Sequence, residues 1–157
     1  MNQSFAALLL AARRERQLVI VTALTDGAPS GQARQARLAQ QQGAGAVELR
    51  ADLLADPAQV CAALTAVRAA SSLPLLLTYR STTEGGKGAG HGQGYEDYLA
   101  SLLQLRPAVA AVDIEMACPA SKALVAEAKA GGYDVVGSCH DFTATPSAAQ
   151  IAEKLAQ

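Results

Sequence analysis

The sequence predicts an α/β fold built around a parallel β-sheet. Short apolar runs recur along the chain, stretches with helical character separate them at a steady interval, and polar side chains gather where the runs end. Strands of a parallel sheet are covered on both faces by their crossover helices, so they read as nearly continuous apolar runs. The expected strands are 18–23, 46–50, 75–80, 112–115 and 135–140.

The segments between these runs are expected to be helices. Apolar residues recur there at i, i+3, i+4 and i+7, or alanine dominates, and both patterns favour helix. Before the first strand, Phe5, Leu8, Leu9 and Ala12 fall on one helical face. The expected helices are 4–16, 31–42, 60–67, 95–102, 121–130 and 147–156. Right-handed crossovers between successive strands then make the sheet parallel.

Length and charge limit the classes of protein to which the chain can belong. With 157 residues, half of them apolar, it is long enough for one core and too short for two ordinary domains. We therefore expect one domain or part of one. The formal net charge of -1, with Lys and Arg scattered along the chain, predicts no nucleic-acid partner and no membrane partner. A small anionic substrate is compatible with this charge.

The cysteines indicate a reducing compartment. Cys61, Cys118 and Cys139 are odd in number and far apart, with no Cys-x-x-Cys pair, so they predict neither a disulfide framework nor a zinc site. Such cysteines are typical of cytoplasmic proteins. The apolar residues 5–12 are too few to span a bilayer, and positive charge follows them instead of preceding them, so they predict a helix and not a signal peptide.

A glycine-rich segment, residues 85–94, follows the third expected strand. This much glycine predicts a mobile lid that holds one conformation only with a ligand or a partner. The segment matches neither the dinucleotide fingerprint nor the P-loop, because Lys87 is followed by Gly88 and not by Ser or Thr. Nucleotide binding is therefore not expected. We expect the side chains of Lys87 and His91 to be solvated, and we assign neither a role.

Polar side chains share one face at the carboxyl ends of four expected strands. Because side chains alternate across a strand, the groups are Glu48 with Arg50 and Asp52, Thr78 with Arg80, Asp113 with Glu115, and Ser138 with His140. Inward residues at that end line the active site of a closed (β/α)8 barrel, and in an open sheet the same edge forms the binding crevice. Either architecture brings them together. The alternative to a functional site is a salt-bridge lattice that caps the sheet.

Four segments carry a more specific signal, and they are Glu48-Leu49-Arg50-Ala51-Asp52, Thr78-Tyr79-Arg80-Ser81-Thr82-Thr83-Glu84-Gly85-Gly86, Val112-Asp113-Ile114-Glu115 and Ser138-Cys139-His140-Asp141-Phe142. In order and spacing they resemble the type I 3-dehydroquinate dehydratases over residues 18–157. Members of that family are (β/α)8 barrels of the TIM-barrel type. The resemblance therefore implies an α/β fold with about five of the eight βα units present, as a single incomplete barrel domain over residues 1–157.

The same resemblance implies a lyase of the shikimate pathway, which supplies aromatic amino acid biosynthesis. The family removes water from 3-dehydroquinate to give 3-dehydroshikimate through a Schiff base with a lysine, and it needs neither a metal nor another cofactor. It is usually dimeric, which implies a homodimer.

The resemblance also assigns roles to residues. His140 would be the general acid/base, and Glu84 would hold its imidazole in orientation. Glu48 and Arg80 would bind the ring hydroxyls of the substrate, with Arg50 pairing to Glu48. The supporting residues would be Asp52, Asp113, Glu115 and Ser138.

The imine-forming lysine of the family has no match in this chain. In the family it lies on the sixth strand, after the helix that corresponds to 147–156. Lys154 lies on that helix and Lys122 begins the previous one, so neither takes the role. We therefore expect the chain, as a truncated form, to be inactive by itself. The alternatives are a non-catalytic derivative that binds a quinate-like ligand or pairs with another chain through its open sheet edges, and an unrelated barrel enzyme with similar clusters.

Overall fold

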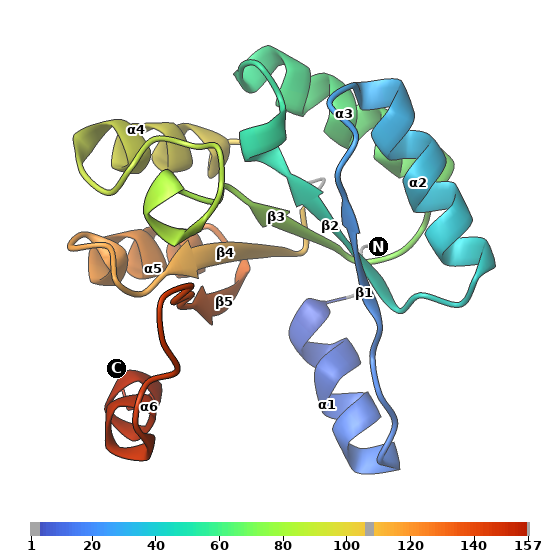
Figure 1. Cartoon of the computed structure of the whole chain (residues 1–157). Coiled ribbons are helices and arrows are strands. Elements are labelled where there is room, and N and C mark those ends of the chain that lie inside the picture. Colours follow the sequence, from blue (N-terminus) through green and yellow to red (C-terminus); the bar gives the residue numbers. More distant parts are fainter. Residues whose placement is uncertain (1–3, 106–108, 157) are drawn as a thin grey trace.

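The computed structural model describes residues 4–105 and 109–156, and its centre is a parallel sheet with the strand order β1-β2-β3-β4-β5 (Figure 1). The strands are β1 Val21–Leu24, β2 Ala46–Arg50, β3 Leu75–Thr78, β4 Ala111–Glu115 and β5 Asp134–Ser138. Every neighbouring pair is parallel. Each crossover moves the chain one place in the same direction, which is the winding of a (β/α) barrel. A doubly wound open sheet would instead reverse direction.

The helices lie where the sequence predicts them. They are α1 Phe5–Glu15, α2 Pro29–Gln41, α3 Pro57–Ala70, α4 Gln93–Leu102, α5 Ser121–Ala130 and α6 Ala148–Leu155, with short 3-10 turns η1 Ala51–Leu53 and η2 Thr82–Glu84. Helices α2 to α5 cover the outer face of the sheet, while α1 and α6 lie apart from that layer (Figure 1). Among the described residues, no helix combines the length and the apolar character needed to cross a membrane.

Three strands are shorter than predicted. The first begins at Val21 and not at residue 18, and Leu18 is 96% exposed. The third and fifth end at Thr78 and Ser138, two residues early. The backbone N–H of Arg80 donates to Asp52 Oδ1 (3.3 Å), and that of His140 donates to Glu84 Oε2 (3.0 Å). Side-chain carboxylates have replaced the neighbouring strand as partners, so both residues lie in loops.

The two faces of the sheet carry different cores. The outer face packs on the helices through a large cluster that includes Leu49, Leu77 and Ile114. The inner face is apolar only near the amino ends of the strands, where Leu76 and Ala111 are buried together. Towards the carboxyl ends the same face is charged. The sheet thus has an apolar base on its inner side and a polar rim.

Helix α1 closes that apolar base. Phe5 is buried against Ala46, Leu76 and Ala111. The hydroxyl of Ser4 and the backbone N–H of Ala6 both donate to Asp134 Oδ2, each at 2.8 Å, which anchors the helix start to β5. A carboxylate at a helix amino terminus is also favoured by the helix dipole.

We predict that Phe5→Ala lowers the free energy of unfolding by about 3 kcal/mol, because it removes the aromatic ring from the inner base. Leu10→Ala is the matched control on the same helix, since Leu10 is 53% exposed, and its effect should stay within about 0.5 kcal/mol. Urea unfolding followed by circular dichroism measures both. Equal stabilities of the two variants would show that α1 does not dock on the sheet.

Candidate active site

Arg80 lies at the centre of the polar rim, with only 9% of its side chain exposed. Its Nη1 lies 3.1 Å from Glu115 Oε1 and 3.4 Å from Glu84 Oε2, and its Nη2 lies 3.2 Å from Asp113 Oδ1. Nη1 also donates to Ser138 Oγ at 2.8 Å. One guanidinium therefore joins groups from β4, from β5 and from the loop after β3.

Glu115 is fully buried and is saturated with hydrogen bonds. Oε1 accepts from Arg80 Nη1 and from the backbone N–H of Ser81 (2.9 Å), and Oε2 accepts from Ser81 Oγ (2.5 Å). Burial by itself would raise the pKa of Glu115, but the hydrogen bonds from Ser81 and His91 and the charge of Arg80 together outweigh it, and the pKa is lowered. This carboxylate is held ionised.

Asp113, on the same strand, responds in the opposite direction. Burial is the largest influence and raises its pKa, although Arg80 and the hydroxyl of Ser138, which donates to Asp113 Oδ1 at 2.8 Å, act against it. Two carboxylates beside one guanidinium therefore have different proton affinities, a feature typical of sites that handle protons.

Glu84 holds His140. The 3-10 turn η2 is capped by Ser81 Oγ, which accepts from the backbone N–H of Glu84, and this turn buries the carboxylate to 3% exposure. Glu84 Oε2 accepts from the backbone N–H of His140 and lies 2.8 Å from its Nδ1. The imidazole is 40% exposed. Within the described part of the chain, Glu84 Oε1 is buried without a hydrogen-bond partner, so one acceptor remains available.

The partner of Arg50 is Asp52, where we expected Glu48. Nε and Nη2 of Arg50 donate to the two oxygens of Asp52, both at 2.8 Å, because η1 turns Asp52 back towards the strand end. Burial would raise the pKa of Asp52, but the hydrogen bonds from Arg50 and from the backbone of Lys87 lower it. The hydrogen bond to Asp52 raises the pKa of Arg50, and the charge of Glu48, which is half-buried on the same face, adds to this effect.

The glycine loop, residues 85–94, which we expected to be a mobile lid, is hydrogen-bonded to the strand ends and runs into α4 at Gln93. Backbone N–H groups of Gly86 and Gly88 donate to the carbonyls of Ser81 and Arg80, at 2.7 and 2.9 Å. A Cβ atom on Gly86 would collide with the Arg80 carbonyl. The glycines therefore permit close approach of two backbones, and Lys87 N–H adds a bond to Asp52 Oδ2 at 3.1 Å.

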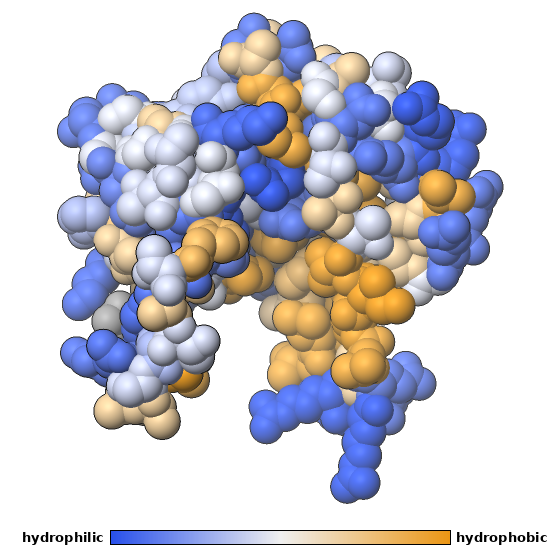
Figure 2. Space-filling model, in the orientation of Figure 1, coloured by the Kyte–Doolittle hydropathy of each residue, from blue (hydrophilic) through white to orange (hydrophobic). Residues whose placement is uncertain are grey.

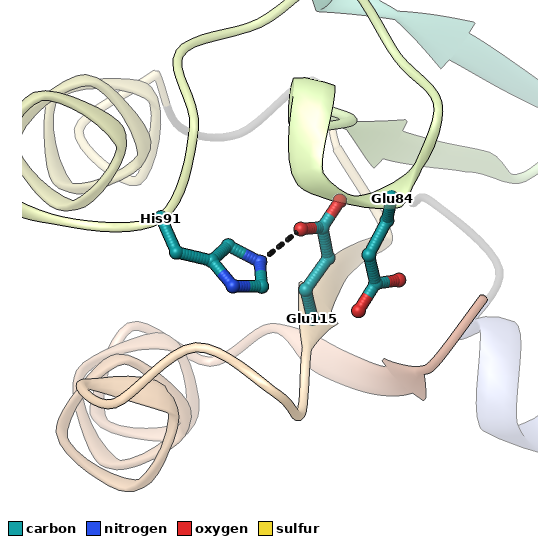
Figure 3. A group of neighbouring side chains, drawn as sticks. All are labelled: Glu84, His91 and Glu115. Carbon is teal, nitrogen blue, oxygen red and sulfur yellow. Dashed lines mark hydrogen bonds and ion pairs between the residues drawn. The ribbon is translucent and has the colours of Figure 1, made fainter. Parts of the chain in front are cut away.

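His91, which we expected to be solvated, points into the cluster (Figure 3). Its side chain is 13% exposed, its Nε2 lies 2.6 Å from Glu115 Oε2, and its ring stands edge-on to Tyr95 with centroids 5.5 Å apart. The one sequence signal was its position, two residues before the helix whose first buried residue is Tyr95. Sequence reasoning missed this residue because loop histidines are usually solvated.

Glu84, His91 and Glu115 offer one ligand atom each within 4.8 Å of one another, a spacing compatible with a metal ion (Figure 3). A cation there would face the Arg80 guanidinium, which already lies 3.4 and 3.1 Å from the two carboxylates. The arrangement therefore favours a proton-handling cluster over a metal centre.

Lys154 lies in a different environment from this cluster. Its Nζ is 2.9 Å from Cys139 Sγ, and both residues line a cavity of about 700 Å³ between α6 and the ends of β4 and β5. The contact with Cys139 raises the pKa of Lys154. A lysine that holds its proton is a poor nucleophile, which agrees with leaving Lys154 out of the imine-forming role.

Most of the predicted site residues lie together in the structure. Six of them form one connected set of contacts: Arg80, Glu84, Asp113, Glu115, Ser138 and His140. Asp52 joins that set through the backbone N–H of Arg80 and brings Arg50 with it. Glu48 lies beside Arg50 with no direct bond to the set among the described residues.

We predict that Arg80→Met lowers the free energy of unfolding at pH 7 by about 3 to 5 kcal/mol, because it leaves three buried carboxylates without their cation. Arg34→Met is the matched control. The Arg34 side chain is 76% exposed, and its loss should cost about 0.5 kcal/mol or less. Urea unfolding measures both variants, and a similar stability for the two would contradict the central role of Arg80.

We also predict how acid affects stability. A carboxylate with a lowered pKa contributes stability above its unfolded pKa, and this contribution is lost as the pH falls through the folded pKa. Asp52→Asn should therefore destabilise the protein at pH 7 and flatten its loss of stability between about pH 5 and pH 2.

Asp113 has a raised pKa, so its ionisation costs stability as the pH rises, and Asp113→Asn should remove this opposing slope. Urea midpoints over a pH series test both signs, and an unchanged slope in Asp52→Asn would contradict the assignment.

Comparisons with known proteins identify the family. The sequence model of the family described as type I 3-dehydroquinase matches residues 20–157. The 3-dehydroquinate dehydratase of Methanosarcina acetivorans is 35% identical to this chain, and the match covers 76% of this chain and 51% of that protein. The 3-dehydroquinate dehydratase of Methanoregula boonei is 39% identical, and the match covers 81% of this chain and 54% of that protein. The structure of the Enterococcus faecalis 3-dehydroquinate dehydratase superposes with a TM-score of 0.76 at 29% identity, over 86% of this chain and 58% of that one. This chain thus spans about half the length of the curated relatives it matches. The chain belongs to the type I 3-dehydroquinase family.

Proposed function

We propose that the polar rim is the acid/base part of a 3-dehydroquinate dehydratase site, which removes water from 3-dehydroquinate to give 3-dehydroshikimate. The observation that carries the proposal is the contact between Glu84 Oε2 and His140 Nδ1, 2.8 Å, at the carboxyl ends of parallel strands. The relatives named above carry this activity in their names.

The Glu84 contact sets the chemistry of the imidazole. An ionised carboxylate only accepts hydrogen bonds, so Nδ1 of His140 is the donor and Nε2 keeps its lone pair. Partial exposure of the ring leaves Nε2 open to a bound molecule. His140 takes the proton from the carbon next to the activated carbonyl carbon and returns it to the departing hydroxyl, so one C=C bond forms and one water leaves.

Substrate binding is assigned to the neighbouring side chains. Arg50 uses Nε and Nη2 for Asp52, which leaves Nη1 for a substrate oxygen, and Glu48 offers a half-buried carboxylate to a hydroxyl. Arg80 makes its contacts within the protein, so its proposed contact with a ring hydroxyl requires it to share its donors. The unpartnered Glu84 Oε1 is a further acceptor for a substrate hydroxyl.

The remaining parts of the proposal concern the whole protein. Residues 1–157 form one domain that contributes five of the eight βα units of a barrel. Its three free cysteines suit a reducing compartment such as the cytoplasm. Two copies associate as a homodimer. Apolar surface gathers beside α1 and β1 (Figure 2), and the exposed apolar residues Leu18, Ile20 and Val21, at the start of the edge strand and just before it, favour association. Sedimentation that shows a monomer at every concentration would contradict the dimer.

The imine-forming lysine is not one of the four lysines of this chain, Lys87, Lys122, Lys129 and Lys154. We therefore expect the 157-residue chain to show no turnover by itself. Mixed with the separately expressed carboxyl-terminal half of one of its relatives, which supplies a lysine, it should show formation of the conjugated product by ultraviolet absorbance. Turnover by the chain alone would contradict our exclusion of these lysines.

In the reconstituted enzyme, His140→Ala should lower kcat by about 10² to 10⁴, the usual contribution of a general acid/base. Glu84→Gln should lower it less, since the amide that replaces the carboxylate still accepts at one oxygen. Lys122→Ala is the control, because Lys122 is exposed on α5 and should leave kcat unchanged. An unchanged kcat in His140→Ala would remove His140 from the acid/base role.

A further inference from the structure

His91 is the loop side chain whose contacts the proposed reaction leaves unexplained. Its Nε2 lies 2.6 Å from Glu115 Oε2 (Figure 3). Its backbone N–H donates to Thr83 Oγ1 at 3.1 Å. The ring edge also packs on Tyr95. Contacts at both the backbone and the ring give this residue one orientation, in a loop that otherwise consists mainly of glycine.

Glu115 connects His91 to Arg80. The two carboxylate oxygens move as one rigid group, so donors on Oε2 fix the direction of Oε1. Oε2 accepts from Ser81 Oγ and from His91, and Oε1 accepts from Arg80 Nη1 at 3.1 Å. The side chain of His91 therefore contributes to the position of the guanidinium.

Arg80 in turn connects to the proposed acid/base. Its Nη1 lies 3.4 Å from Glu84 Oε2, and that same oxygen accepts from the backbone N–H of His140 and from its Nδ1. Contacts thus run without a gap from the ring of His91 to the ring of His140. The side chains that carry them are buried, so solvent does not screen the charges along this path.

We propose that His91 is a positioning residue. Its hydrogen bond to Glu115 fastens the glycine loop over the strand ends and, through Arg80 and Glu84, holds the imidazole of His140 in its orientation. The role rests on the proposed function, in which His140 is the acid/base, and it names a residue that acts on that site without touching the reacting atoms.

The two histidines make the proposal measurable without substrate. They are the only histidines in the sequence, so an untagged chain gives ring signals from these two alone. Each has a carboxylate as partner, and an ionised carboxylate only accepts. His91 therefore donates from Nε2 and His140 donates from Nδ1, so the two rings use different nitrogens for their contacts, and nitrogen chemical shifts distinguish them.

The experiment compares His91→Gln, His91→Asn and His91→Ala in the untagged 157-residue chain. The amide nitrogen of glutamine lies near the position of Nε2, whereas that of asparagine lies near Nδ1 and does not reach Glu115. Proton–nitrogen spectra of the His140 ring and amide hydrogen exchange of residues 86–91 are recorded for each. Lys87→Ala is the control in the same loop, because the Lys87 side chain is exposed and its backbone bond to Asp52 stays.

We expect His91→Ala and His91→Asn to shift the His140 ring signals and to speed loop exchange roughly tenfold or more, as the loss of a charge-assisted hydrogen bond does. His91→Gln and Lys87→Ala should resemble the wild type in both readouts. If His91→Ala fails to fold, the comparison between the Gln and Asn variants carries the test, since both retain a polar side chain of similar character.

Three results would overturn the proposal. Wild-type exchange and wild-type His140 signals in the Asn variant would remove any role for the His91 bond. Faster loop exchange with unchanged His140 signals would mean that His91 anchors the loop but does not position the His140 ring. Identical behaviour of the Gln and Asn variants would show that a donor at Nε2 is not what matters. Failure of the dehydratase assignment appears only in the turnover assay, so the two proposals are judged separately.

Discussion

The pairing of the Arg80 guanidinium with buried carboxylates is the constraint on which the rest of the polar rim depends. Removing a charge from water is costly, and the attraction between opposite charges offsets this cost only when the geometry is good and the remaining donors and acceptors are satisfied. Glu115 meets that condition through Arg80 and Ser81, whereas for Asp113 the contacts with Arg80 and Ser138 offset only part of the cost of burial, and its pKa stays raised. Because the partners come from β4, β5 and the loop after β3, satisfying Arg80 sets the relative positions of these strand ends.

The sheet supplies a rigid base for that network. Its strands run in sequential parallel order, so their carboxyl ends meet along one edge, and alternation of side chains sends apolar residues to the helices and polar ones to the inner face. Helix α1 buries Phe5 under the apolar part of the inner face. The charged rim is therefore supported from below by packed side chains, which limits the movement of groups that must keep hydrogen-bond geometry.

Glycine in this loop allows one backbone to pack closely against another. Gly86 and Gly88 allow the loop backbone to approach that of Arg80 more closely than any side chain would permit. Asp52 then bridges the loop and the strand end, since it accepts from the backbone N–H groups of both Lys87 and Arg80. The loop becomes part of the wall of the site, and His91 is carried into contact with Glu115 as a result.

The sequence by itself determined the order of the elements, the parallel sheet, the family and most residues of the polar rim, because apolar periodicity and alternation are local and the motifs lie at strand ends. Tertiary structure decided the partners. Arg50 pairs with Asp52 and not with Glu48 because a 3-10 turn after the strand redirects the Asp52 carboxylate, and such a turn leaves no periodic signal. His91 joins the cluster because backbone bonds fold the glycine loop onto residues 80 and 81. Hydrogen bonds between residues far apart in sequence depend on the folded backbone, and no local pattern encodes them.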